Sequence, residues 1–225
     1  METIDKKGFD YTFDCKPDFG FVTIKIPNGK KLKVEAAAMA TMDTNLEMKT
    51  ALKGGLGRFL TGESLFINEF TAKNGNAEIQ IAPACPGDVE HIYLQNETIY
   101  IQNTAFLASS ETILTETKFQ GLVKGFFSGE NLFLIKCSGE GDLWFNSFGG
   151  IIALDVEEGF VVDTGHIVAF TEGLTYDISR VGGYKSLFFS GEGLVCKFSG
   201  KGKIWIQTKK ITPFVNWTMP FRPKK

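Results

Sequence analysis

The stretch GLVKGFFSGENLFLIKCSGEGDLWF, residues 121–145, carries the pattern on which the prediction of the fold depends. Its first half has the form Gly121-x7-Gly129-Glu130-Asn131-Leu132. Two other stretches have the same form, namely Gly54-x7-Gly62-Glu63-Ser64-Leu65 and Gly183-x7-Gly191-Glu192-Gly193-Leu194. A hydroxyl residue precedes each Gly-Glu pair, and two apolar residues precede the hydroxyl residue. The three copies are offset by 67 and 62 residues.

A second marker recurs at nearly the same offsets. It consists of Ala37-Ala38-Met39-Ala40, Thr104-Ala105-Phe106-Leu107 and Thr164-Gly165-His166-Ile167, which are 67 and 60 residues apart. A third marker, SGEGDLWF at 138–145, resembles SGKGKIWI at 199–206. Two markers that keep one period along a chain indicate an internal repeat. The sequence therefore predicts three copies of one structural unit.

Each copy reads as β-structure. Short apolar runs bounded by glycine-containing turns are typical of buried strands, and they occur at 65–67, 132–135 and 194–198. The β-branched and aromatic runs at 99–101 and 160–162 also favour strands. The best helical candidate is 46–60, although Gly54, Gly55 and Gly57 weaken it.

We therefore predict an all-β chain with three similar units, each a β-sandwich or double-stranded β-helix, in a pseudo-threefold arrangement within one compact body. The predicted boundaries are 1–84 for the first unit with an N-terminal extension, 85–148 and 149–210 for the next two, and 211–225 for a C-terminal tail. Units of about 60–65 residues are near the lower size limit for independent stability, so we expect them to share a core.

Composition limits the classes of function. The net charge is −2 and the basic pairs are scattered, which does not favour nucleic-acid binding, because phosphate neutralisation needs a basic surface. The four cysteines form no Cys-x-x-Cys pair, and no apolar run approaches the length of a membrane helix. We expect a cytoplasmic protein with reduced thiols and without a cofactor.

The motifs support a resemblance to one family. The runs Phe127-Ser128-Gly129-Glu130, Val162–Phe170 and Gly191-Glu192-Gly193-Leu194 are similar to those of the altered-inheritance-of-mitochondria family, over about Val34 to Lys209. The resemblance implies a double-stranded β-helix fold grouped with the tryptophan RNA-binding attenuation protein. It also implies a homo-oligomer, with a trimer favoured. Because fold and function are separable, it implies little about chemistry.

One tripeptide looks catalytic. Asp163-Thr164-Gly165 follows an apolar strand-like run, as in aspartic proteases, where two such loops share a proton. The tripeptide is also one version of the repeated turn that Asn103-Thr104-Ala105 represents in the second copy. We therefore favour a structural turn. His166 belongs to the same turn, and we expect it to make a satisfied polar contact. The two histidines lack the His-x-His pattern of cupin metal sites.

The repeated carboxylates are a second candidate site. In a pseudo-threefold arrangement Glu63, Glu130 and Glu192 occupy equivalent positions, where they would bind a cation or a basic partner. The alternative, which we favour, is that each accepts backbone hydrogen bonds at a turn.

The tail ITPFVNWTMPFRPKK, residues 211–225, is aromatic and ends in basic residues. Its three prolines argue against an amphipathic helix. Docking on a neighbouring subunit is favoured over a membrane interface.

Three functions remain open. The leading hypothesis is a non-enzymatic structural or interaction protein that forms a homo-oligomer and has a possible protein partner. The second is a small-molecule-binding module with its pocket between units or subunits. The third is an enzyme of unknown class.

Overall fold

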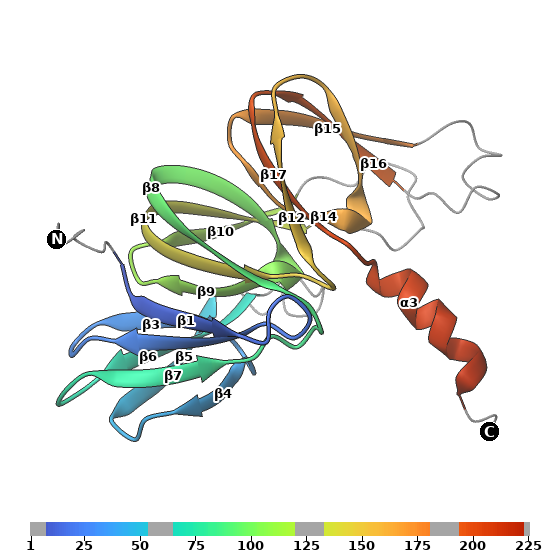
Figure 1. The fold of residues 1–225 in the computed structure, drawn as a ribbon. Coiled ribbons are helices and arrows are strands. Elements are labelled where there is room, and N and C mark those ends of the chain that lie inside the picture. Colours follow the sequence, from blue (N-terminus) through green and yellow to red (C-terminus); the bar gives the residue numbers. More distant parts are fainter. Residues whose placement is uncertain (1–7, 54–64, 120–132, 181–193, 223–225) are drawn as a thin grey trace, which may run out of the picture.

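The computed structural model describes residues 8–53, 65–119, 133–180 and 194–222, which form strands β1 to β17 and a single short α-helix at the C-terminal end (Figure 1). This confirms the all-β prediction. The apolar runs predicted as strands lie in strands, in β6 (Leu65–Ala72), β8 (Val89–Gln102), β11 (Phe133–Asn146), β13 (Phe160–Asp163) and β16 (Leu194–Gly200). Within the strands, burial alternates, as in β7 (Ala77–Ile81), whose first, third and fifth residues are buried.

The strands fall into three consecutive groups, here called units 1, 2 and 3. Unit 1 contains β1 (Asp10–Asp14), β2 (Phe21–Ile26), β3 (Lys31–Glu35), β4 (Met39–Met42), β5 (Leu46–Lys53), β6 and β7. Unit 2 contains β8, β9 (Phe106–Ser110), β10 (Leu114–Phe119) and β11. Unit 3 contains β12 (Ile151–Val156), β13, β14 (Ile167–Thr171), β15 (Leu174–Arg180), β16 and β17 (Gly202–Gln207).

One pairing pattern occurs in all three units. In unit 1 we number the strands β2 to β7 as positions 1 to 6. The strand at position 6 (β7) pairs with those at positions 1 and 3 (β2 and β4). The strand at position 5 (β6) pairs with those at positions 2 and 4 (β3 and β5). Strands β12 to β17 pair in the same way in unit 3. In unit 2 the long strand β8 covers positions 1 and 2, and β11 covers positions 5 and 6. In units 1 and 3 these pairings form two antiparallel groups of three strands, whereas in unit 2 the long strands β8 and β11 join the two groups into one sheet.

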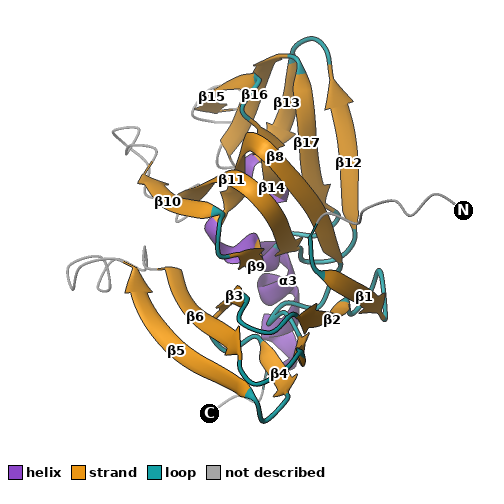
Figure 2. Cartoon of the chain, turned by 90° about the vertical axis from the view of Figure 1, so that its left-hand side faces the viewer, coloured by secondary structure: helices purple, strands orange, loops and turns teal. Residues whose placement is uncertain are grey.

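Neighbouring units are joined by strand pairing that we call seams. At the first seam β3 of unit 1 pairs antiparallel with β9 of unit 2. At the second seam β8 of unit 2 pairs antiparallel with β14 of unit 3. Position 2 of one unit therefore pairs with position 3 of the next, and both seams belong to one ten-stranded sheet that runs through the molecule. Figure 2 shows the units following one another along this sheet.

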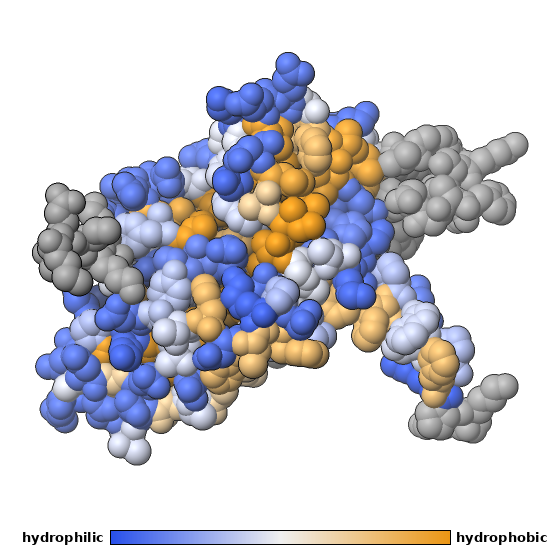
Figure 3. All heavy atoms as spheres, in the orientation of Figure 1, coloured by the Kyte–Doolittle hydropathy of each residue, from blue (hydrophilic) through white to orange (hydrophobic). Residues whose placement is uncertain are grey.

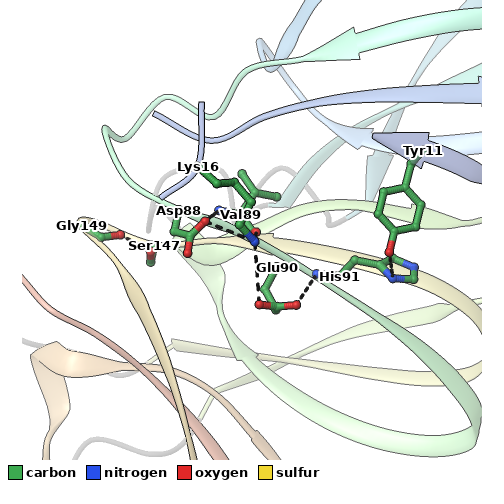
Figure 4. Close-up of polar contacts among 8 residues, drawn as sticks. All are labelled: Tyr11, Lys16, Asp88, Val89, Glu90, His91, Ser147 and Gly149. Carbon is green, nitrogen blue, oxygen red and sulfur yellow. Dashed lines mark hydrogen bonds and ion pairs between the residues drawn. The ribbon is translucent and has the colours of Figure 1, made fainter. Parts of the chain in front are cut away.

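The segments that enter successive units are hydrogen-bonded to one another. The Gly20 amide donates to the Gly87 carbonyl (2.6 Å), and the Asp88 amide donates to the Gly149 carbonyl (2.9 Å). The Thr208 amide in turn donates to the Gly150 carbonyl (3.0 Å). These backbone bonds hold the three units in a fixed order, and Figure 4 shows part of this region around Asp88.

Buried hydrophobic residues form three clusters that cross unit boundaries. Trp144 of unit 2 packs in the cluster built on β2, β3 and β7, and Trp205 of unit 3 packs in the cluster of unit 2. Leu134 of unit 2 likewise belongs to the cluster of unit 3. The units therefore share their cores, as their small size requires.

Two helix predictions were wrong. Residues 46–53, part of the best helical candidate, form strand β5, because pairing with β6 along its whole length outweighs local propensity. In the tail, α3 (Ile211–Thr218) is helical despite the prolines. Pro213 is the third residue of α3, in the first turn, where its missing amide removes no helical hydrogen bond.

A buried lysine crosses the first seam. Lys33 of β3 is 5% exposed, and its Nζ donates to the carbonyls of Glu111 (2.6 Å) and Ile113 (2.8 Å) in unit 2. A charged group is retained in such a site only where hydrogen bonds satisfy it.

We expect Lys33→Met to lower the free energy of unfolding by about 2–4 kcal/mol, because both carbonyls lose a charged donor. The matched control is Lys31→Met, which removes an exposed ion pair with Glu111 (3.7 Å) and should cost under about 1 kcal/mol. Urea denaturation followed by tryptophan fluorescence measures both. Equal losses would contradict a special role of Lys33.

Candidate interaction site

Two strands lack the seam partner that their counterparts have. Among the described residues, β4 at position 3 of unit 1 pairs only with β7, and β13 at position 2 of unit 3 pairs only with β16. The position-3 strands β9 and β14 both pair across a seam, and so do the position-2 strands β3 and β8. Units 1 and 3 thus each have one strand, β4 or β13, that lacks the seam pairing of its counterparts in the described residues.

The open edges are also exposed, unlike their counterparts. In β4 no residue is buried, whereas every residue of β9 is buried and all but the last of β14. Exposed large hydrophobic residues lie on both edges: Met42 is 39% exposed, Phe160 41% and Val161 57%. Figure 3 shows hydrophobic surface gathered over unit 3. Unpaired, apolar strand edges are unusual because they promote association with other strands.

Asp163 lies at the end of the open strand β13 and is fully engaged. Its Oδ1 accepts from the Gly165 amide (2.9 Å) and its Oδ2 from Lys210 Nζ (2.9 Å). The short 3-10 helix η2 (Thr164–His166) begins at this point. Asp163 therefore acts as a turn-forming and ion-pairing residue in this geometry, rather than as one of two carboxylates that share a proton.

His166 makes a polar contact at the same place. Its Nδ1 lies 2.6 Å from the Gln207 carbonyl oxygen, and Gln207 Nε2 donates to the Gly165 carbonyl (2.8 Å). These bonds attach the η2 turn to the end of β17, next to the start of α3.

The candidates Glu63, Glu130 and Glu192 lie outside the described residues, in the segments between β5 and β6, β10 and β11, and β15 and β16.

A polar network that the sequence does not reveal lies where β1 meets units 1 and 2. His91 Nδ1 lies 2.8 Å from Tyr11 Oη, and His91 Nε2 lies 2.9 Å from Asp142 Oδ1. Asp142 is buried and also accepts from the Phe9 amide (2.9 Å) and Ser110 Oγ (3.2 Å). Figure 4 shows the Tyr11 hydroxyl directed at the His91 ring.

This network resembles a catalytic triad only in that a hydroxyl, an imidazole and a carboxylate are hydrogen-bonded in that order. Both nitrogens of His91 are already engaged, and the hydroxyl group is a tyrosine phenol rather than a serine. The hydrogen bonds instead attach the N-terminal strand to the body of the protein. The members of the network are up to 133 residues apart in sequence and belong to no motif, so only the pairing of the strands brings them together.

Neither a metal centre nor a membrane-spanning helix is present in the described part of the chain. No group of three or more His, Cys, Asp or Glu side chains there is placed to hold a metal ion. None of the helices in these residue ranges has the length and hydrophobicity needed to cross a bilayer.

Glu35 occupies the position at the end of β3 that Asp163 occupies at the end of β13. Burial raises the pKa of the Glu35 carboxyl from its usual 4.5 to about 7. The pKa of the half-buried Cys85 thiol is raised too, first by burial and then by the charge of Glu35. Burial therefore favours the neutral form of the Glu35 carboxyl.

The raised pKa predicts a specific pH dependence of stability. Because the folded protein holds the Glu35 proton more tightly than the unfolded chain, the free energy of unfolding falls as pH rises from about 4.5 to about 7. Glu35→Gln removes this loss, so the variant should gain up to about 3 kcal/mol relative to the wild type between pH 5 and pH 8. Urea denaturation of both proteins at the two pH values measures this difference. Parallel pH profiles would refute it.

Comparison with known proteins agrees with this architecture. An uncharacterised protein of Streptococcus pyogenes serotype M6 is 28% identical over 226 aligned residues, which cover 95% of this chain and 91% of that protein. The crystal structure of a Streptococcus pyogenes protein superposes with a TM-score of 0.81 at 26% identity, over 95% of this chain and 100% of that one. The family model described as mitochondrial biogenesis AIM24 matches residues 11–209. The chain therefore belongs to the mitochondrial biogenesis AIM24 family.

Proposed function

We propose that the chain is a non-enzymatic structural or interaction protein that assembles as a homotrimer in the cytoplasm. The observation that carries this proposal is the pair of open, apolar strand edges, β4 and β13, at opposite ends of a row of units. Backbone groups on such edges gain hydrogen bonds, and the exposed side chains lose contact with water, when another strand pairs with them.

The repeat and its arrangement form part of the proposal. We propose unit boundaries at 1–84, 85–148 and 149–210, with a tail at 211–225, a pseudo-threefold arrangement, and a grouping of the fold with the tryptophan RNA-binding attenuation protein. The common pairing pattern of the three units supports the internal repeat. The net charge of −2 supports protein partners rather than nucleic acid.

We expect the purified protein to have three times the 24.9 kDa mass of one chain in size-exclusion chromatography with light scattering. Met42→Glu places a charge on the open edge of β4 and should shift the protein to monomer. Met48→Glu is the matched control, because Met48 is 48% exposed on β5 in a position without a seam. A wild-type monomer at high protein concentration, or equal behaviour of the two variants, would count against the proposal.

The tail supplies a further docking element. Among the large side chains of α3 and of the following 3-10 helix η3 (Met219–Phe221), Trp217 is 64% exposed and Phe221 73%. Phe214 touches Phe148 of the body with ring centroids 5.3 Å apart, and Figure 1 shows α3 extending away from the units. We propose that this apolar helix docks on a neighbouring subunit, with a membrane surface as the less favoured alternative.

Removal of residues 211–225 should weaken the oligomer, so that it dissociates at a higher protein concentration than the full chain. Dilution series analysed by light scattering measure this change. Co-sedimentation with anionic liposomes is the second measurement. Sedimentation of the full chain that is lost on truncation would favour the membrane alternative over subunit docking.

A small-molecule-binding module remains the second candidate, because both seams carry a cavity at corresponding turns. The cavity at the first seam has about 430 Å³ and is lined by Lys31, Tyr93 and Glu111, among others. The cavity at the second seam has about 530 Å³ and is lined by Glu97, Glu172 and Trp205, among others. A bound compound in native mass spectrometry of the purified protein would favour this function.

A further inference from the structure

The two seams inside the chain have the same register. At the first seam Val34 lies opposite Ala108, and at the second Ile101 lies opposite Ala169. Val34 is the last residue but one of β3, which ends at Glu35. Ile101 is likewise the last residue but one of β8, which ends at Gln102. Val162 is the corresponding residue of β13, which ends at Asp163.

The position-3 strands correspond just as closely. Each pairs with its position-6 strand with one register shift, between Met39 and Thr41 in β4 and between Ile167 and Ala169 in β14. The β9 pairing shifts at the same place, between Phe106 and Ala108. Thr41 therefore corresponds to Ala108 and Ala169, the first residues of β9 and β14 that pair across the two seams.

A side-chain hydrogen bond confirms this alignment of the position-3 strands. Ser110 Oγ accepts from the Asp142 amide (2.9 Å), and Thr171 Oγ1 accepts from the Lys203 amide (3.0 Å). Asp43 Oδ2 accepts from the Glu78 amide (2.7 Å) in unit 1. In all three units the residue at the end of position 3 thus caps the start of position 6. Ser110 and Thr171 are the last residues of β9 and β14 that pair across a seam. Asp43, the residue that follows β4, is the equivalent residue in unit 1.

The burial of the open edges supports the same correspondence. Phe160 corresponds to Leu32 and Ile99, both of which are buried at their seams. Met42 corresponds to Ser109 and Phe170, which are also buried there. Phe160, Val161 and Met42 are exposed. The two edges thus carry the two halves of a seam of the same kind as those inside the chain, and a second copy of this chain offers the matching half to each.

We infer that β13 of one copy pairs antiparallel with β4 of a second copy, with Val162 opposite Thr41, Val161 opposite Met42, and Phe160 opposite Asp43. This inference rests on the proposed self-association and specifies its geometry. The contact is heterologous, because the edge donated by one copy differs from the edge donated by the other. Repetition of such a contact closes a ring or continues as a filament.

Engineered cysteines test the register. Directly opposed residues of antiparallel strands have Cα atoms about 4.5–5.5 Å apart, which suits a disulfide bond. In a chain with Cys15→Ser, which removes the exposed thiol, we expect Met42→Cys with Val161→Cys to form disulfide-linked oligomers under mild oxidation. Non-reducing gel electrophoresis should show at least ten-fold more linked product than the control pair Met48→Cys with Val161→Cys.

Mixing the two single variants provides a second test. Each copy then carries one engineered thiol, so an equimolar mixture of Met42→Cys and Val161→Cys should give linked dimers and nothing larger, while either variant alone should give about ten-fold less. In the double variant a ladder that ends at the trimer supports a closed ring, and a longer ladder supports a filament with the same seam.

The outcomes separate this inference from the proposed function. If light scattering shows an oligomer but the 42–161 pair links no better than the control pair, the register is wrong and self-association stands. If the protein is monomeric at all concentrations and no pair links, both are overturned.

Discussion

Antiparallel pairing between position 2 of one unit and position 3 of the next is the interaction on which the structure depends. Backbone amide and carbonyl groups must find partners when they are buried, and a small β unit by itself leaves these groups unpaired along its edge strands. The seams satisfy them and at the same time bring the apolar clusters of adjacent units together. The units therefore cannot be treated as separate domains, because both their hydrogen bonds and their cores cross the boundaries.

Several polar residues that look functional in isolation serve this architecture. Lys33 donates across the first seam. Asp142 binds the residue before β1, His91 of β8 and Ser110 of β9, and Asp163 binds the η2 turn and Lys210. The buried charges of Lys33 and Asp142 are offset by several hydrogen bonds, which is the usual condition for a charge in a protein interior. Polar groups in the described residues thus mainly determine how strands are placed.

The sequence predicted the strands better than their partners. Apolar runs such as Ile99–Ile101 and Leu194–Phe198 identify strands because burial depends on local pattern. The segment Leu46–Lys53 was mistaken for part of a helical candidate, since its strand form depends on β6, a segment distant in sequence. The pairing gives Ala169 of β14 the same place as Ala108 of β9, a separation of 61 residues, whereas the sequence marker predicts 60. No sequence motif indicates the network of Tyr11, His91 and Asp142, because its formation depends on the register of strands that are distant in sequence.

The short connections between units have a consequence for the residues that a seam can contain. Residues 147–150 join β11 of unit 2 directly to β12 of unit 3, so the two units, and with them the strands of the second seam, are held together at a high effective concentration, in the millimolar range typical of short linkers. Such a seam forms at any dilution and tolerates large or charged residues at its centre, as Tyr100 and Lys33 illustrate. The corresponding residue on the open edge is Val161. Covalent connection of the units within one chain therefore relaxes the sequence requirements of the internal seams relative to those of an edge that has to capture a separate chain.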